Sequence, residues 1–157
     1  LRLPGTDGKA KMSKSLGNCI YLSDPPETVR QKVMSMFTDP NHIRVQDPGC
    51  TDGNPVFIYL DAFCRPEHFA EFLSDYSCLD ELKAHYRRGG LGDTTVKRFL
   101  CSVLLSELGP IQKRRHEWEQ HTDDVREILH CGCKTAQQKA AETLSCVRRA
   151  MRINYFE

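Results

Sequence analysis

The stretch at residues 93–108 reads DTTVKRFLCSVLLSEL, and its apolar residues recur at helical spacing. They are Val96, Phe99, Leu100, Val103, Leu104 and Leu108. Spacings of three and four residues place side chains on one face of an α-helix, so the stretch predicts a long helix with one buried side. Asp93 stands just before the first apolar position and predicts the N-cap. Gly109 and Pro110 follow directly, and we expect them to kink or break the helix.

Helical patterns continue on both sides of this stretch. Apolar stripes follow start signals made of a capping residue or of proline in the first turn. These starts lie at Asp24, Asn54, Pro66, Ser77 and Thr122. Residues 38–53 are rich in Pro, Gly and Asp and predict a loop, and no segment alternates as a strand does. The sequence therefore predicts an all-α helical bundle, whose last apolar face is interrupted at Gly132 and runs to Met151.

Composition narrows the class of protein without naming a partner. The 157 residues are 39% hydrophobic and 27% charged, which is typical of a folded globular chain. No apolar run reaches the roughly 20 residues that a membrane-spanning helix needs, so we expect no membrane partner. The net charge of +1 balances 22 basic against 21 acidic residues. Nucleic-acid binding would therefore have to depend on local basic clusters.

The eight cysteines are predicted to be reduced thiols. The sequence shows no secretory signal, and its amphipathic segments build a core without cross-links. No CxxC pair occurs, and Cys131-Gly-Cys133 lacks the partner spacing of a zinc site, so no metal is predicted. These features together predict a cytoplasmic protein, with an organellar one as the alternative.

Residues 1–23 carry the motif with chemical content. The turn-forming string LPGTDG at residues 3–8 leads into KMSKS at residues 11–15. Neither a helical nor a strand period is present, so the segment predicts a mobile surface loop. Basic, glycine-rich loops are most often only solvated surface, and the pentapeptide alone leaves that interpretation open.

The pentapeptide is the KMSKS signature of class I aminoacyl-tRNA synthetases, and its surroundings resemble the tryptophanyl-tRNA synthetases. LPGTDG before it and LGN after it are similar to that family. Further matching strings follow in the same order: TDP at 38–40, GNPVF at 53–57, RGGLGD at 88–93, GPI at 109–111 and VRRAM at 147–151. The resemblance covers essentially the whole chain and is far more specific than one pentapeptide.

The resemblance implies a division of the chain. Residues 1–23 would be an irregular segment from the end of a truncated Rossmann-like α/β catalytic domain, and residues 24–157 a helical domain that binds the tRNA anticodon. In the family, the HIGH-type motif, the tryptophan pocket and the nucleotide-binding sheet all precede KMSKS. Because the chain starts at Leu1 rather than Met and lacks these parts, we expect a truncated piece that does not activate tryptophan alone.

Two lysines suit the reaction that the resemblance implies. In amino-acid activation a carboxylate attacks the α-phosphate of ATP, and negative charge moves onto the departing pyrophosphate. Cations placed there stabilise the transition state more than the bound ATP. By similarity Lys11 and Lys14 are catalytic, and Mg²⁺ accompanies the ATP of the parent enzyme. The ATP-binding residues implied are Leu3, Lys11, Met12, Ser13, Lys14 and Ser15.

Basic clusters on the helical part are the candidate tRNA contacts. Lys and Arg neutralise phosphates, and splayed RNA bases stack on guanidinium or aromatic planes. Lys97-Arg98 is a weaker cluster, and Trp118 is a candidate for stacking, although a lone Trp at helical spacing is typical of a core. Charge runs on helices are also typical of solvated faces. The candidates are Arg87, Arg88, Lys113, Arg114, Arg115, Arg148, Arg149 and Arg152.

The resemblance also implies partners. The parent enzyme would be a homodimer that binds tRNA(Trp) and ATP, with tryptophan held only by the missing half, and we expect the fragment to be a monomer. Some family members carry an iron–sulfur cluster on four cysteines. Cys78 and Cys101 fit the first spacing, but Leu108 and Ile111 stand at the next two positions, so no cluster is predicted.

Two alternatives remain open at this point. The tyrosyl-tRNA synthetases share the architecture; GTDG at residues 5–8 and the Pro110-Ile111 segment favour tryptophan, but the deciding pocket is absent. The second alternative is a non-catalytic helical module that binds RNA or protein. The intact Lys11 and Lys14 argue against a decayed loop.

Overall fold

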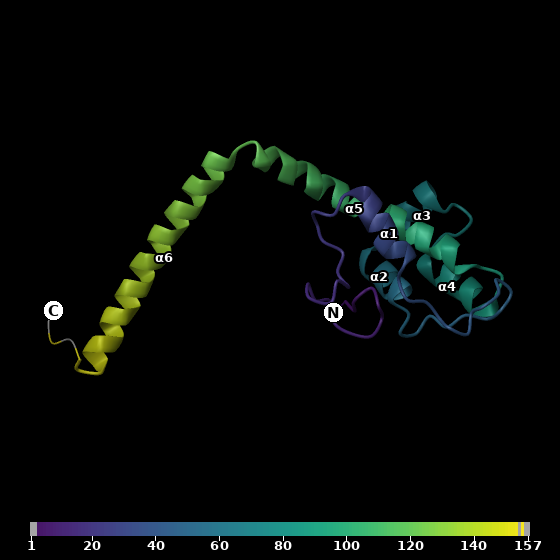
Figure 1. Cartoon of the computed structure of the whole chain (residues 1–157), viewed down its shortest axis with the longest axis horizontal. Helices are drawn as coiled ribbons and strands as arrows, with labels where there is room; N and C mark the ends of the chain where they lie inside the picture. The colour runs from purple at the N-terminus through teal and green to yellow at the C-terminus, as the bar shows by residue number, and fades with distance from the viewer. Residues whose placement is uncertain (1–2, 154, 156–157) are drawn as a thin grey trace. The chain divides into compact units, whose positions relative to one another are not determined.

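Six α-helices make up the regular structure of the computed structural model, which describes residues 3–153 and residue 155 (Figure 1). Within these residues there is no strand, only an isolated bridge between Pro4 and Lys11. The all-α class that the sequence predicted is confirmed. None of the six helices combines the length and the apolar character needed to cross a membrane. In chain order they are α1 (Pro26–Met34), α2 (Pro55–Phe63), α3 (Pro66–Phe72), α4 (Leu79–Arg88), α5 (Asp93–Glu119) and α6 (Thr122–Ala150).

Capping explains where α2 begins and corrects the prediction for α1. The side-chain oxygen of Asn54 accepts the N–H of Val56 at 3.1 Å, as an N-cap does. At α1, however, the N-cap position is taken by Pro25, and no side chain caps the helix. The carboxylate of Asp24 forms an ion pair with Lys32 instead. The same oxygen accepts the N–H of Tyr21 at 2.8 Å, so the carboxylate of Asp24 is engaged by Tyr21 and Lys32 and does not cap α1.

The core of the structure forms around α5. Its Val96, Phe99, Leu100, Val103 and Leu104 are all buried. Short helices from earlier in the chain cover this stripe, and Figure 1 shows α5 beginning among them. Their buried contributions are Val29 and Val33 from α1, Val56, Phe57 and Leu60 from α2, Phe69 from α3, and Leu82 and Tyr86 from α4. Burial of one apolar face thus decides how the short helices are arranged.

A hydrogen bond between Tyr86 and Asp93 joins α4 to α5, and His42 of the loop at residues 38–53 lies beside it. Asp93, predicted as the N-cap of α5, is its first residue, and its carboxylate accepts the hydroxyl of Tyr86 at 2.6 Å. The Nδ1 atom of buried His42 lies 3.3 Å from the same oxygen. Burial, together with the bond to Asp93, raises the pKa of Tyr86, so this hydroxyl remains a donor.

α5 continues through Pro110 to Glu119, so it is not broken where the sequence predicted a kink or break. Proline removes one N–H donor and crowds the carbonyl four residues earlier. Ser106, which bears that carbonyl, is exposed, so solvent can satisfy it. The predicted interruption at Gly132 is likewise absent from α6. Exposed helix interiors tolerate these residues at a cost in stability rather than in continuity.

The chain divides into two compact units, Leu1–Gln112 and Lys113–Glu157. Residues 3–23 belong to the first, with Leu3 and Ile20 packed against its core. In the second, α6 buries no residue, and Ile128 on its apolar face is 60% exposed. The boundary at residues 23/24 inferred from the resemblance concerns the parent enzyme and stays a prediction.

Replacing Leu100, which is 0% exposed, by Ala should lower the unfolding free energy of the first unit by about 3 kcal/mol, because the change leaves a cavity in the core. Urea unfolding followed by near-ultraviolet circular dichroism of the tyrosines measures this, since Tyr59 and Tyr86 are buried in the first unit. Leu129→Ala on α6, at a side chain 63% exposed, is the control and should change it by less than about 0.5 kcal/mol. Equal losses in both variants would contradict this placement of the core.

Candidate functional site

Residues 3–18 form a hairpin-like loop that carries the KMSKS motif. Its stem is the bridge between Pro4 and Lys11, beside which the N–H of Gly5 donates to the carbonyl of Ala10 at 2.8 Å. Gly8 lies at the tip with φ of 67°, a left-handed conformation that glycine adopts without strain. The loop predicted from the sequence therefore has a defined backbone.

Asn18 fixes the second half of this loop and is only 5% exposed. Its Oδ1 accepts the N–H of Ser13 at 2.8 Å. Its Nδ2 donates to the carboxylate of Asp7 at 3.2 Å and to the carbonyl of Lys11 at 3.3 Å. A Cβ at Gly5 would lie 2.2 Å from Nδ2, so this close approach requires glycine. One buried amide thereby joins both arms of the loop.

Asp7 is a charged acceptor inside the loop. Burial opposes ionisation of its carboxyl group, but hydrogen bonds from the Asn18 amide and from the N–H groups of Lys9 and Ala10 outweigh it. They hold the pKa of Asp7 below its ordinary value. The carboxylate therefore stays ionised at neutral pH and keeps these donors in place.

The motif lysines lie on the outside of this fixed backbone. Lys11, Lys14 and Ser15 are exposed, whereas Met12 and Ser13 are half-buried. The hydroxyls of Ser13 and Ser15 are 2.8 Å apart and share a hydrogen bond. Both ammonium groups can thus meet an anion that approaches from solvent, while the residues between them hold the loop.

A shallow hollow beside the motif brings two of the predicted ATP-binding residues together. Leu3 and Lys11 line it with Pro4, Lys9, Ala10 and Ile58. An apolar patch beside ammonium groups suits a nucleotide, whose base is flat and apolar and whose phosphates are anionic. Met12, Ser13, Lys14 and Ser15 do not line the hollow but follow Lys11 directly in the loop.

Tyr59 of α2 contacts this loop although no sequence pattern pointed to it. Its hydroxyl donates to the carbonyl of Pro4 at 2.8 Å and lies 3.4 Å from the sulfur of Met12. Figure 1 shows the loop before α1 beside α2. Asn18 was part of a matching string, but its contacts were not predicted either. Both side chains act through partners that only the folded chain brings close.

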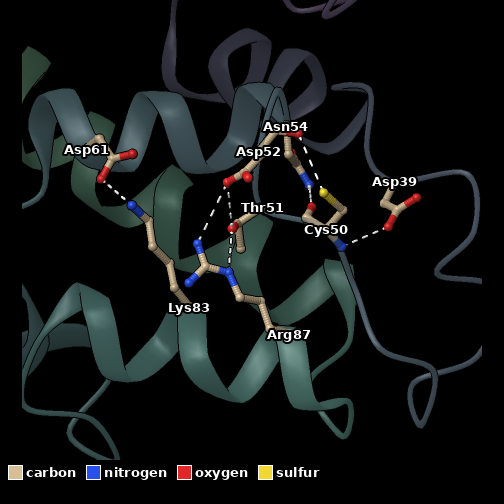
Figure 2. Close-up of polar contacts among 8 residues, drawn as sticks. All are labelled: Asp39, Cys50, Thr51, Asp52, Asn54, Asp61, Lys83 and Arg87. Carbon is tan, nitrogen blue, oxygen red and sulfur yellow. Dashed lines mark hydrogen bonds and ion pairs between the residues drawn. The ribbon is translucent and has the colours of Figure 1, made fainter.

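Arg87, on α4, is held by the loop that precedes α2. Its Nε donates to the hydroxyl of Thr51 at 2.8 Å, and its guanidinium lies 3.7 Å from the carboxylate of Asp52. Lys83, one turn earlier, pairs with Asp61 of α2, and Figure 2 shows both side chains reaching from α4 toward α2 and its preceding loop. The side chain of Arg87 stays 56% exposed in a fixed orientation.

A polar hollow lies next to Arg87 and is shaped by the loop at residues 38–53. The carboxylate of Asp39 accepts the N–H groups of Asn41 and Cys50 at 2.9 and 2.8 Å (Figure 2 shows the second). These hydrogen bonds hold the pKa of Asp39 below its ordinary value. The hollow is lined by Asp39, Asn41, Cys50 and Arg87, together with Pro48, Gly49, Thr51 and Asp52.

The other predicted tRNA contacts are spread over both units. Arg88 lines a different hollow, with Tyr76 and His85. Arg115 pairs with Glu119 at 2.9 Å. The six beyond Arg88 belong to the second unit: Lys113, Arg114 and Arg115 on α5, Arg148 and Arg149 in the last turn of α6, and Arg152 just after it. No single unit therefore holds all eight residues.

Lys97 differs from the other basic residues that the sequence singled out. It is 9% exposed, and its ammonium donates to the carbonyl of Met34 at 2.9 Å, at the carboxyl end of α1. A cation there satisfies a free carbonyl and complements the helix dipole. Burial lowers the pKa of Lys97, although the charge of Asp93 opposes this. Of the weaker Lys97-Arg98 cluster, only Arg98 is therefore exposed. Trp118, the candidate for base stacking, is 52% exposed and lies outside the core.

Metal-ligating side chains do not gather in the part of the chain that the structure describes. It contains no group of three or more His, Cys, Asp or Glu residues placed to hold an ion. All eight cysteines fall within the described residues and are free thiols.

Comparison with known proteins assigns this loop and these helices to a family. Residues 2–105 match the family described as tRNA synthetases class I (W and Y). The tryptophan–tRNA ligase of Streptococcus mutans serotype c is 57% identical over 99% of the chain and 44% of the ligase. That of Clostridium longisporum is 54% identical over 99% of the chain and 43% of the ligase. The chain thus spans less than half the length of these curated relatives.

Solved structures share the fold. The tryptophanyl-tRNA synthetase of Campylobacter jejuni, complexed with ADP and tryptophan, superimposes with a TM-score of 0.75 at 24% identity, over 96% of this chain and 43% of that one. The tyrosyl-tRNA synthetase of Archaeoglobus fulgidus, complexed with L-tyrosine, gives 0.54 at 25% identity, over 71% of this chain and 35% of that one. The resemblance predicted from the sequence is confirmed, and the chain belongs to the class I tRNA synthetases of the tryptophan and tyrosine type.

Proposed function

We propose that the chain acts as the carboxy-terminal part of a tryptophan–tRNA ligase. In this proposal the KMSKS loop stabilises the phosphates of ATP during tryptophan adenylation, and the helical part binds the anticodon region of tRNA(Trp). The observation that carries it is the loop itself: a fixed hairpin holds Lys11 and Lys14 exposed, beside a hollow that Leu3 lines. The identities of 54% and 57% to ligases for tryptophan favour that amino acid over tyrosine.

The loop would act on charge that appears during the reaction. The tryptophan carboxylate attacks the α-phosphate, the bond to the bridging oxygen breaks, and pyrophosphate leaves with additional negative charge. Lys11 and Lys14 would meet that charge, and Ser13 and Ser15 add hydroxyl donors. Because the backbone behind them is already ordered by Asn18, little reorganisation is needed at the moment of reaction. Mg²⁺ would enter with the ATP phosphates.

The helical part would contribute RNA contacts. Arg87 meets the requirement for such a contact, because it is charged, exposed and oriented by Thr51 and Asp52. The basic residues of the second unit would neutralise phosphates without reading sequence. We further propose that tryptophan is held by the missing half, that the parent enzyme is a cytoplasmic homodimer, and that the fragment alone is a monomer.

The isolated chain is expected to show no tryptophan-dependent exchange of pyrophosphate into ATP. The reason is that the proposed tryptophan pocket and nucleotide-binding sheet lie outside these residues. The exchange assay measures this directly, with the intact Streptococcus mutans ligase as the positive control. Exchange by the chain alone would contradict the proposal that tryptophan is held by a part of the enzyme outside these residues.

Replacing Lys11 or Lys14 by Ala should slow adenylation about 100-fold, the typical effect of removing one preorganised group that meets transition-state charge. The assay uses a chimaera in which the remaining part of the Streptococcus mutans ligase precedes this chain. Lys134→Ala removes an exposed lysine of α6 that belongs neither to the motif nor to the lining of the hollow, and it should change the rate less than about threefold. Similar rates in all three variants would leave the loop without a role in ATP chemistry.

Replacing Arg148 and Arg149 together by Ala should weaken tRNA binding and reduce the slope of log affinity against log salt by about 2, because each phosphate contact contributes roughly 0.9. Filter binding of this chain to tRNA(Trp), and to the same tRNA with a changed anticodon, measures both quantities. Replacing Lys134 and Lys139 of the same helix together by Ala removes the same amount of charge and is the matched control. An unchanged salt slope would remove the arginine pair from the RNA contacts.

A further inference from the structure

The hydroxyl of Tyr59 ties α2 to both arms of the KMSKS stem. It donates to the carbonyl of Pro4, 2.8 Å away in the first arm, and lies 3.4 Å from the sulfur of Met12 in the second. Pro4 is bridged to Lys11, the residue before Met12. One phenol thus contacts the stem from both sides at the level of the first motif lysine.

This contact is shielded from water. Tyr59 is 3% exposed, and burial, with smaller effects from Cys19 and Asp7, raises the pKa of Tyr59 to about 12. The hydroxyl therefore keeps its proton at neutral pH and remains a donor. If the stem moved away, this hydroxyl would exchange its protein acceptors for water, a change that costs the net value of one hydrogen bond.

α2, the helix that carries Tyr59, is held in place by the core and by its cap. Val56 and Leu60 on α2 are 1% and 0% exposed, and the side chain of Asn54 caps its first turn. Asp61 pairs with Lys83, which joins α2 to α4. The position of the Tyr59 hydroxyl is therefore set by the helical core rather than by the loop.

A second contact attaches the loop tip to the end of α1. The N–H of Phe37 donates to the carbonyl of Thr6 at 2.9 Å. A Cβ at Gly8 would lie 2.9 Å from the ring of Phe37, so the tip packs closely there. Because Phe37 holds the tip and Tyr59 the stem, removing the Tyr59 hydroxyl should free the stem specifically.

We infer that Tyr59 is a positioning residue of the KMSKS loop: α2 holds its hydroxyl so that the stem is fixed and Lys11 and Lys14 stand beside the hollow lined by Leu3. The effect of Tyr59 on catalysis rests on the proposed function. The effect of Tyr59 on the loop conformation does not rest on it and can be measured in this chain alone. Charges that are already in place stabilise a transition state better than charges that must first be ordered.

Tyr59→Phe keeps the ring and removes the hydroxyl. Trypsin cuts after lysine, so cleavage after Lys11 and Lys14 reports opening of the loop. We expect this cleavage to be about fivefold faster in the variant, the factor that corresponds to losing one net hydrogen bond, because cleavage follows the population of the open loop. Mass spectrometry of the peptides measures it, relative to cleavage after Lys134 on α6.

Tyr86→Phe is the matched control, since it also removes a buried phenol hydroxyl, one that donates to Asp93 at 2.6 Å away from the loop. It should leave cleavage after Lys11 and Lys14 unchanged. Equal acceleration in both variants would show a general loss of stability, and no acceleration in Tyr59→Phe would show a loop that stands without this contact. Either result overturns the inference.

The effect of Tyr59 on catalysis is tested in the chimaera with the Streptococcus mutans ligase. Tyr59→Phe should lower kcat of pyrophosphate exchange about fivefold and leave KM for tryptophan within about twofold, whereas Tyr86→Phe should change neither. Faster cleavage with an unchanged kcat would overturn the positioning role. Exchange that resists Lys11→Ala and Lys14→Ala would instead contradict the proposed function, and the cleavage result would still decide whether Tyr59 fixes the loop.

Discussion

Burial of the apolar stripe on α5 is the constraint on which the first unit depends. α1, α2, α3 and α4 have 9, 9, 7 and 10 residues, lengths at which isolated helices are not stable in water. They persist because each places apolar side chains on the same core. The rigidity of α2, and with it the position of the KMSKS stem, is therefore a consequence of packing around α5.

The helices could be predicted from the sequence because their signals are local. The spacing of Val96 to Leu108 and the cap at Asn54 depend on residues a few positions apart, and the structure has both. Asp24 is not the cap because Pro25 takes the N-cap position, while the Asp24 carboxylate accepts the N–H of Tyr21 and pairs with Lys32. Pro110 failed as a break because its surroundings are solvent, which tolerates an unpaired carbonyl that a core would not.

The site was predictable only as far as its motif. KMSKS identifies the lysines, but the side chains that order the loop are not marked by spacing. Tyr59 and Met12 are 47 positions apart, and Lys97 and Met34 are 63. From the sequence, a tyrosine on an apolar helix face is expected to be a core residue, and a lysine beside an arginine is expected to be a surface residue. Only the packing of α1 and α2 shows which polar partner each one finds.

The continuity of α5 has a consequence for cooperativity. Its backbone passes from one compact unit to the other, yet its buried side chains end at Leu108 and α6 buries none. Amide protection against hydrogen exchange should therefore fall along a single helix. Near Phe99 it should correspond to the free energy of global unfolding of the first unit, and beyond Lys113 it should be nearly absent. An unfolding free energy measured on the first unit therefore does not describe the second, which we expect to melt gradually, as an isolated helix does.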